Sequence, residues 1–253
     1  IRQALQAQAE RLGLGRARPG LPRGVCGRPW VGELPRQFDV GVYRAAAERI
    51  LSGRFDVFAL KEAGLGFPPQ WNRDRRAGPG APLKFGKTMI SRNGRIVGER
   101  KYLGEQNRHA ELVTLAQAWH LTGEAKYAQG CRVLLESWFE QCPYPLGVNW
   151  TSSLEHGVRL VNWAVAWFLL GEENLESGFR GRWLDAIYRH CHFIAGHFSR
   201  HSSANNHLLG ELMGLFIGAT VWPLWPESAR WRERAKREFE VEALKQNAAD
   251  GVN

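Results

Sequence analysis

No stretch of 18 consecutive apolar residues occurs in this sequence, and its four cysteines form no C-x-x-C pair. The first absence argues against a membrane-spanning helix, and the second argues against a zinc ribbon or a disulfide framework. The phosphate-binding patterns G-x-G-x-x-G and G-x-x-x-x-G-K-[ST] and the nucleophile pattern G-x-S-x-G are also missing. We therefore expect buried or idle thiols, and we predict no membrane span, no metal and no cofactor.

Positive charge and tryptophan, in contrast, are plentiful. The 253 residues include 34 Lys and Arg against 25 Asp and Glu, which gives a net charge of +9, and they include 11 Trp. Such an excess suggests a polyanionic partner, which is a nucleic acid, an acidic membrane surface or an acidic polysaccharide. Some of the tryptophans must belong to the core, but an indole ring is also a flat surface on which sugars or bases stack.

Helical periodicity dominates the second part of the chain. We predict a basic, Gly- and Pro-rich segment over 1–37 that begins with a short helix, and a single domain over 38–253. Its lobe at 54–102 is irregular, with a short strand at 54–60 and at most a hairpin around Asn93-Gly94, and helices follow from about 103. Short breaks join antiparallel neighbours, so we predict an all-α bundle, solenoid or (α/α) toroid. The expected helices are 40–53, 105–121, 124–141, 152–170, 179–200, 205–221 and 227–247.

The stretch HSSANNHLLGELMGLF, residues 201–216, is unusually polar for the start of an apolar helix. Asn205 or Ser203 can serve as the N-cap, but a cap explains neither Asn206 nor His207. The start of a helix carries partial positive charge and free N–H groups, which suit an anion. We therefore expect this helix start to bind a ligand.

Glycines follow on one face of the same helix. His207, Glu211, Gly214 and Gly218 are spaced so that they share that face. Each glycine costs up to about 1 kcal/mol in a helix relative to alanine, so two of them argue for close helix packing. His207 and Glu211 are then expected at the rim of the packed region.

The helix at 152–170 carries a polar stripe formed by Glu155, Arg159 and Asn162 on an otherwise apolar surface. Ser152 and Glu155 also fit a capping box, which is the alternative reading of Glu155. A buried Glu–Arg pair is costly unless it is well bonded. The stripe therefore either faces a solvated cleft or forms a structural ion pair.

Two further clusters are less specific. Asn107, Glu111 and Thr114 share a helix face, which is either functional or simply solvated. A metal site of His190, His197 and His201 is conceivable from their spacing, but no carboxylate follows at ligand spacing, and we do not predict one.

Three phrases resemble the heparinase II/III-like polysaccharide lyase family, in its order and at roughly its spacing. They are NRHAELVTLAQAWHLTGEAKYA, GVNWTSSLEHGVRLVNWAVAWFLL and SSANNHLLGELMGLFIGA. The resemblance covers about residues 38–253 and implies an all-α, incomplete (α/α) toroid. In the family this toroid is followed by an antiparallel β-sandwich, which would lie beyond residue 253 and pack on the toroid.

The resemblance implies β-elimination on a uronate-containing acidic polysaccharide, heparan sulfate-like or alginate-like. The family's NNH element matches Asn205-Asn206-His207. It implies that Asn206 neutralises the uronate carboxylate and that His207 is a neutraliser or proton acceptor. The family's catalytic tyrosine follows a DGVN-like phrase, so it would lie just past Asn253. The chain as given is then expected to carry the carboxylate-neutralising half of the site.

Other matches imply softer roles in substrate binding. Trp150 either stacks on a sugar ring or packs in the core, and the remaining residues either orient substrate or tie helices together. The expected substrate-binding set is Asn107, Arg108, His109, Asn149, Trp150, Glu155, Arg159, Asn205 and Glu211.

Two alternatives to a lyase stay open. One is a non-catalytic protein that binds acidic glycans or is associated with exopolysaccharide biosynthesis. The other is an inverting glycoside hydrolase, which needs two carboxylates roughly 6.5–9.5 Å apart, drawn from Glu111, Glu155 and Glu211. We predict an acidic polysaccharide as the partner and no nucleic acid, because charge alone supports the latter. We expect the protein to be periplasmic or secreted in a bacterium.

Overall fold

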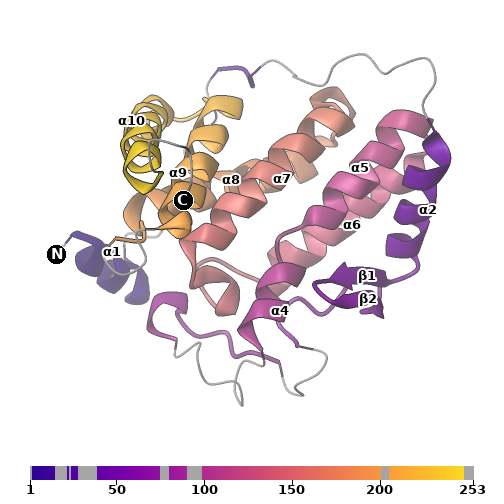
Figure 1. Ribbon diagram of the computed structural model, residues 1–253, viewed down its shortest axis with the longest axis horizontal. Helices are drawn as coiled ribbons and strands as arrows, with labels where there is room; N and C mark the ends of the chain where they lie inside the picture. Colours follow the sequence, from indigo (N-terminus) through magenta and orange to yellow (C-terminus); the bar gives the residue numbers. More distant parts are fainter. Residues whose placement is uncertain are drawn as a thin grey trace. The chain divides into compact units, whose positions relative to one another are not determined.

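The computed structural model describes residues 2–14, 22, 24–27, 39–74, 80–89, 99–200 and 205–247, and most of these are helical (Figure 1). This confirms the predicted all-α class. The α-helices are α1 (Arg2–Arg11), α2 (Val40–Leu51), α4 (Arg100–Gln106), α5 (Ala110–Thr122), α6 (Ala125–Gln141), α7 (Ser153–Leu170), α8 (Ser177–Gly196), α9 (Asn206–Val221) and α10 (Ser228–Gln246). Short 3₁₀ helices are η1 (Gly86–Thr88), η2 (Val148–Trp150) and η3 (Glu172–Asn174).

Helix boundaries agree with the sequence except at two places. Helices α2, α6, α7, α9 and α10 begin and end within two residues of the predicted bounds. Helix α8, predicted to reach residue 200, ends at Gly196. The reason is that the Ser199 N–H donates to the carboxylate of Glu211, at 2.6 Å, instead of to a carbonyl of its own helix.

The predicted helix 105–121 is wrong as a single element, because the structure has two helices there. Helix α4 ends at Gln106 and α5 begins at Ala110. His109 adopts left-handed backbone angles, with φ 63° and ψ 34°, which no continuous α-helix accommodates. The triplet Asn107-Arg108-His109 therefore forms a corner between two helices.

The predicted strand 54–60 is the first part of a hairpin. Strand β1 (Arg54–Val57) pairs antiparallel with β2 (Leu60–Gly64), with Arg54 opposite Gly64 and an irregularity between Phe55 and Val57. Gly53, at φ +78°, closes the base of the hairpin against Gly66, where an added Cβ would lie 2.9 Å from the backbone of Gly66. The hairpin expected at Asn93-Gly94 lies outside the described residues.

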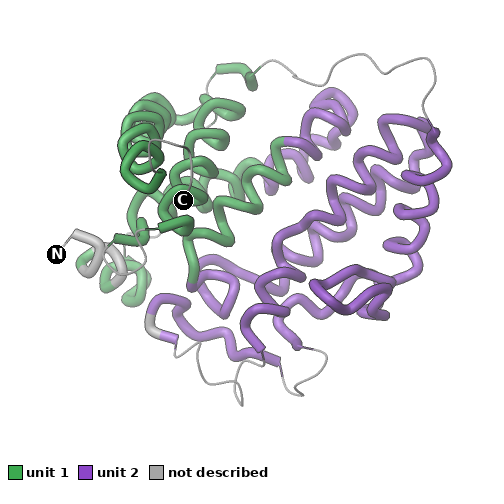
Figure 2. The backbone as a smooth tube through the Cα atoms, in the orientation of Figure 1, with its two compact units in different colours: residues 1–28, 152–164, 184–253 green, residues 29–151, 165–183 purple. Residues whose placement is uncertain are grey.

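The chain divides into two compact units (Figure 2). Unit 1 comprises residues 1–28, 152–164 and 184–253, and unit 2 comprises residues 29–151 and 165–183. Helices α7 and α8 contribute residues to both. The division into a segment 1–37 and a domain 38–253 stays a prediction.

Unit 1 is built around helices that touch through glycine. A Cβ on Gly214 of α9 would lie 2.2 Å from the Cα of Gly157 on α7, so the two backbones are in direct contact. Gly218 packs in the same way against Cys191 of α8, whose Sγ would lie 2.8 Å from an added Cβ. The close packing predicted from Gly214 and Gly218 is thereby confirmed.

Unit 2 is built instead around large aromatic rings and one buried amide. The Trp138 Nε1 donates to the Oδ1 of Asn107 at 2.8 Å. The Nδ2 of Asn107 donates to the carbonyls of Trp71 and Leu103, at 2.9 and 2.8 Å. The His109 ring lies edge-on to both indoles, with centroids 5.1 Å from Trp71 and 5.2 Å from Trp138. The corner between α4 and α5 is thus locked into the core of this unit.

The cysteines match the expectation of buried or idle thiols. Cys131, Cys142 and Cys191 are buried, Cys26 is partly buried, and all four are free thiols. Burial raises the pKa of the Cys131 and Cys191 thiols, so these two stay protonated. Among the described helices, none has both the length and the apolar character needed to cross a membrane.

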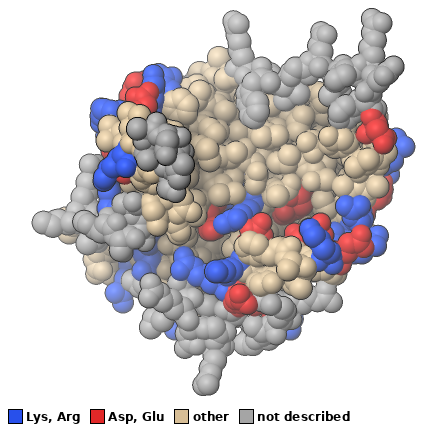
Figure 3. All heavy atoms as spheres, viewed as in Figure 1, with Lys and Arg blue, Asp and Glu red and all other residues tan. Residues whose placement is uncertain are grey.

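Charged side chains of both signs lie beside one another on the face drawn in Figure 3. Ion pairs on the described surface are of the same mixed kind, such as Arg44 with Glu124 at 3.0 Å and Arg234 with Glu238 at 2.9 Å. Such exposed pairs contribute little to stability, with a median of about 0–1 kcal/mol each.

Candidate functional site

The start of α9 presents the two residues predicted to be catalytic. Asn205 caps the helix, because its side chain accepts a hydrogen bond from the His207 N–H at 3.1 Å, which confirms the predicted cap. Ser203, the alternative cap, lies outside the described residues. Asn206 is exposed and His207 is partly buried. With the cap assigned to Asn205, the amide of Asn206 has no hydrogen-bond partner among the described residues and is accessible to a ligand.

Glu211 anchors the segment that leads into this helix start. Its side chain is fully buried and accepts two hydrogen bonds from Ser199, from the N–H at 2.6 Å and from the Oγ at 2.5 Å. The hydroxyl of Ser153 donates to the His197 carbonyl at 2.6 Å, just before it. The prediction that Glu211 sits at a rim is wrong. Its burial favours a role in positioning residues 197–199 over contact with a substrate.

The polar residues predicted to form a stripe on α7 differ in how deeply they are buried. Arg159 is fully buried and donates through Nε to the Nε2 of His190 at 2.9 Å. The Nδ1 of His190 lies 2.7 Å from the Ala186 carbonyl, which only an N–H can satisfy. These two contacts require the neutral His190 ring with its proton on Nδ1. Arg159 is thereby tied to α8 as a structural element, while Glu155 and Asn162 are partly buried on α7.

Three buried histidines serve the core of unit 1. Besides His190 on α8, His197, just past the end of α8, directs its Nδ1 at the Phe193 carbonyl at 3.0 Å. The ring of His156 stacks on Phe193 with centroids 4.4 Å apart. Among the described residues, no three His, Cys, Asp or Glu side chains are grouped as metal ligands, and His201 lies outside that set.

Trp150 and Asn149 belong to the interior of unit 2. Trp150 is 2 % exposed, and its Nε1 donates to the Cys142 carbonyl at 3.0 Å. Its ring lies edge-on to Tyr144, with centroids 4.7 Å apart. Asn149 donates to the Oδ1 of Asn72 at 3.1 Å and is also buried. This placement favours the core-packing alternative for Trp150 over stacking on a sugar ring.

The NRH phrase is likewise mostly structural in its placement. Asn107 and His109 are buried in the corner between α4 and α5, as described above. Arg108 is partly exposed and pairs with Glu105, Nη1 to Oε2 2.6 Å. Of the residues predicted to bind substrate, those in unit 2 are therefore held by protein partners.

Two tyrosines of the described chain, Tyr127 and Tyr188, are poorly suited to proton transfer. Tyr127 is buried and donates its hydroxyl to Glu48 at 2.8 Å. Burial, together with the nearby Glu227 carboxylate, raises the pKa of Tyr188 to about 12. A tyrosine that exchanges protons near neutral pH needs the opposite shift.

Sequence reasoning missed Ser153 and Ser199, the two groups that hold the segment before α9. Ser153 lies 54 residues before His207 in the chain, and Ser199 lies 12 residues before Glu211. A serine also carries no sequence motif that would indicate such a role. It also missed a polar pocket in unit 2 that includes Gln70, Arg73 and Gln106. No spacing rule connects these positions, because the fold brings them together.

What the exposed helix start can do is bind an anion. The amide of Asn206 offers two N–H donors, the ring of His207 offers one or two, and the helix adds its partial positive charge. Donors that are fixed before the ligand arrives stabilise negative charge at little reorganisation cost. The carboxylate of an acidic sugar is a ligand of the required charge and size.

Comparisons with known proteins identify the family and the fold of the chain. The model of the family described as Heparinase II/III N-terminus matches residues 102–253. No curated protein gives a significant match. The heparan sulfate lyase HepC from Pedobacter heparinus is similar in structure, with a TM-score of 0.66 and 19% identity over 85% of this chain and 31% of that one. A heparinase III with methylated lysines gives a TM-score of 0.62 and 16% identity, over 84% and 33%. The chain thus spans about a third of the length of these structures and shares their fold there.

Proposed function

The chain belongs to the heparinase II/III family, and on that premise we propose that it forms part of a polysaccharide lyase. The substrate is a uronate-containing acidic polysaccharide, heparan sulfate-like or alginate-like. The observation that carries the proposal is the start of α9, where Asn205 provides the cap and Asn206 stays exposed beside His207. The residues 1–253 supply the carboxylate-neutralising part of the site.

The proposed reaction is β-elimination. A base takes the proton from C5 of the uronate, the C4–O bond breaks, and the electron pair forms a C4=C5 double bond while the leaving oxygen takes up a proton. The C5 proton is a poor acid as long as the neighbouring carboxylate keeps its full negative charge. Hydrogen bonds from Asn206 and His207 spread that charge and stabilise the enolate-like state.

The proton transfers need further groups. Instead of donating to the carboxylate, His207 can accept the C5 proton through a ring nitrogen. By resemblance to the family, we propose that a tyrosine past Asn253 protonates the leaving oxygen. A β-sandwich domain that packs on the helices, and a periplasmic or secreted location, belong to the same proposal.

An inverting hydrolase is less well supported. Both oxygens of Glu211 accept hydrogen bonds from Ser199 inside the protein, so this carboxylate is poorly placed to activate water. A glycan-binding protein without turnover remains the main competitor, and one assay separates the three functions.

The assay incubates the full-length protein with heparan sulfate, alginate and hyaluronan and follows the ultraviolet absorbance of the unsaturated product. We expect absorbance to grow with at least one polymer, and Asn206→Ala to lower kcat by about 100-fold. New reducing ends without absorbance would indicate hydrolysis, and binding without either would indicate a non-catalytic protein.

The matched control is Gln129→Ala, which removes an exposed side-chain amide from α6 in unit 2. We expect its rate to stay within about threefold of the parent. A rate within twofold for Asn206→Ala in an active enzyme would contradict the assignment of the site.

A further inference from the structure

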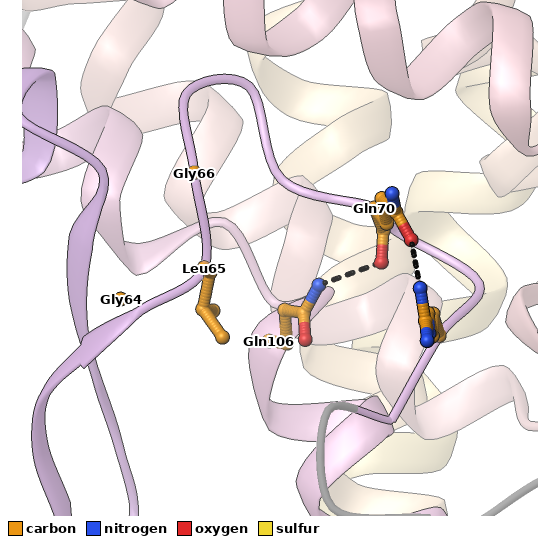
Figure 4. A pocket seen from close by; sticks show the side chains of 6 residues that line it. Gly64, Leu65, Gly66, Gln70 and Gln106 are labelled. Carbon is orange, nitrogen blue, oxygen red and sulfur yellow. Dashed lines mark hydrogen bonds between the residues drawn. The ribbon is translucent and has the colours of Figure 1, made fainter. Parts of the chain in front are cut away.

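A pocket of about 360 Å³ lies within unit 2, between the end of β2 and helix α4 (Figure 4). Its volume falls within the roughly 300–1,000 Å³ range of small-molecule sites. Three of its lining residues are the backbone run Gly64–Gly66, and the others are Gln70, Arg73 and Gln106. Only Leu65 offers an apolar side chain, so the pocket suits a polar ligand.

Hydrogen bonds fix the polar groups of this pocket relative to one another. Arg73 donates through Nη1 to the Oε1 of Gln70 at 3.2 Å, and Gln106 donates through Nε2 to the Gln70 carbonyl at 3.1 Å (Figure 4). Within the described part of the chain, neither the Nε2 of Gln70 nor the Oε1 of Gln106 has a partner. These two atoms provide one donor and one acceptor, a combination that suits a sugar hydroxyl.

Arg73 gives the described lining a positive charge. It is the one charged residue among the described lining residues, and none of these is a carboxylate. A guanidinium forms two parallel hydrogen bonds with a carboxylate or a sulfate. The pocket therefore favours a ligand with hydroxyl groups and one anionic group.

The glycine wall of the pocket is held in place by the base of the hairpin. The N–H groups of Leu65 and Gly66 both donate to the Gly53 carbonyl, at 2.8 and 3.2 Å. Gly66 has φ +82°, a conformation that L side chains rarely adopt. The backbone shape of this wall thus exists before any ligand binds.

An aromatic pair lies along the same hairpin and helix. Phe58, at the turn between β1 and β2, is 48% exposed and meets Tyr102 edge-on, with ring centroids 5.5 Å apart. Tyr102 precedes Gln106 by four residues on α4, so the two side chains share a helix face. An exposed ring in this position can pack against the C–H face of a pyranose ring.

We propose that this surface of unit 2 is a saccharide-binding subsite for an acidic polysaccharide. Arg73 pairs with a uronate carboxylate or a sulfate, Gln70 and Gln106 bind the hydroxyls of the same sugar, and Phe58 packs against its neighbour. The identity of the polysaccharide rests on the proposed function, but the pocket is separate from Asn206 and His207, which belong to unit 1.

The test is isothermal titration calorimetry of the full chain with hexasaccharides of heparan sulfate, alginate and uncharged dextran. We expect binding of at least one acidic hexasaccharide and none of dextran. Arg73→Ala and Gln106→Ala should each weaken it by about tenfold, the effect of losing one good polar contact. Arg237→Ala on α10, which removes the same charge from an exposed position of unit 1, should change affinity by less than about twofold.

Three results would overturn the subsite. They are no binding of either acidic hexasaccharide, unchanged affinity in both pocket variants, and equal weakening by Arg237→Ala. If the protein turns over a polymer, Arg73→Ala should raise KM by about tenfold and leave kcat within about twofold, whereas Asn206→Ala should lower kcat. Absence of turnover with intact, pocket-dependent binding would refute the lyase proposal and leave the subsite standing.

Discussion

Helices α5 and α9 begin near similar sequences but differ in their surroundings. An Asn-x-His triplet stands at each start: Asn107-Arg108-His109 precedes α5, and Asn205-Asn206-His207 spans the cap and the first two residues of α9. In the first triplet, the asparagine and the histidine are buried and bonded to the core of unit 2. In the second triplet, the asparagines are exposed. The same residue types thus support the core in one place and are exposed to solvent in the other.

The glutamates that follow the two triplets differ as well. Glu211 is fully buried, and its two oxygens hold Ser199. Glu111 lines a pocket of about 160 Å³ and is partly buried, while its Oε1 is buried and has no hydrogen-bond partner among the described residues. Burial raises the pKa of Glu111 to about 8. The difference teaches that partners, and not spacing after a motif, decide what a buried carboxyl does.

The largest expected loss of stability comes from disturbing the contact between Gly214 of α9 and Gly157 of α7. Gly214→Ala would place a Cβ 2.2 Å from the Cα of Gly157, and a backbone atom cannot rotate away. We expect the free energy of unfolding to fall by about 4 kcal/mol, measured by urea denaturation.

The control is Gly181→Ala on α8, where an added Cβ meets no atom within 4 Å. Alanine is the better helix former, so this variant should gain up to about 1 kcal/mol. A Gly214→Ala protein as stable as the parent would mean that the glycine contact does not hold α9 against α7.

The next largest effect on stability is expected at Asn107, in contrast to Asn206. Asn107→Ala leaves the carbonyls of Trp71 and Leu103 and the Trp138 Nε1 without their partner. We expect a loss of about 3 kcal/mol in the free energy of unfolding. Asn206→Ala, at an exposed position, should change it by less than about 0.5 kcal/mol. Thermal and urea unfolding measure both changes. Similar losses of stability in the two variants would contradict the distinction between a buried and an exposed triplet.

Glu211 connects stability to the site. Glu211→Ala removes both acceptors of Ser199, and we expect a loss of about 2 kcal/mol in stability. The segment before Asn205 then loses its anchor, so kcat should fall by roughly tenfold. Glu211→Gln keeps one acceptor and should retain most of both. Equal behaviour of the two variants in unfolding and rate assays would argue against a positioning role.

Glu111 introduces a pH dependence of stability. An unfolded glutamate ionises near pH 4.5, whereas the folded one keeps its proton up to about pH 8. Between these pH values the folded state binds more protons, so the free energy of unfolding falls as the pH rises. Glu111→Gln should remove this slope and be more stable than the parent at pH 8.

The control for Glu111→Gln is Glu240→Gln, which removes an exposed carboxylate on α10. Denaturation curves from pH 5 to pH 8 should be parallel for this control and the parent. The same parallel behaviour in Glu111→Gln would show that the Glu111 carboxyl is solvated in the folded protein.

Much of the helical fold was readable from the sequence because its signals are local. The periodicity of apolar residues located α6, α7, α9 and α10, and the glycines of α9 predicted its contact. The corner at His109 was missed, since NRHAEL continues the helical pattern and only burial of Asn107 and His109 between two indoles explains the left-handed turn. In the candidate site, the cap at Asn205 was readable, whereas the anchor at Ser199 was not.

The sequence by itself determined the helical class, the family resemblance and which residue types stand at the start of α9, because periodicity and motifs are properties of neighbouring residues. Only the tertiary structure decided which asparagine is hydrogen-bonded in the core and which is exposed. It also decided which glutamate accepts hydrogen bonds from the segment that follows α8. Burial and hydrogen-bond partners depend on segments far apart in the chain, such as Trp71 with Asn107 and Trp138. Two triplets with the same chemistry therefore acquire different roles from the packing around them.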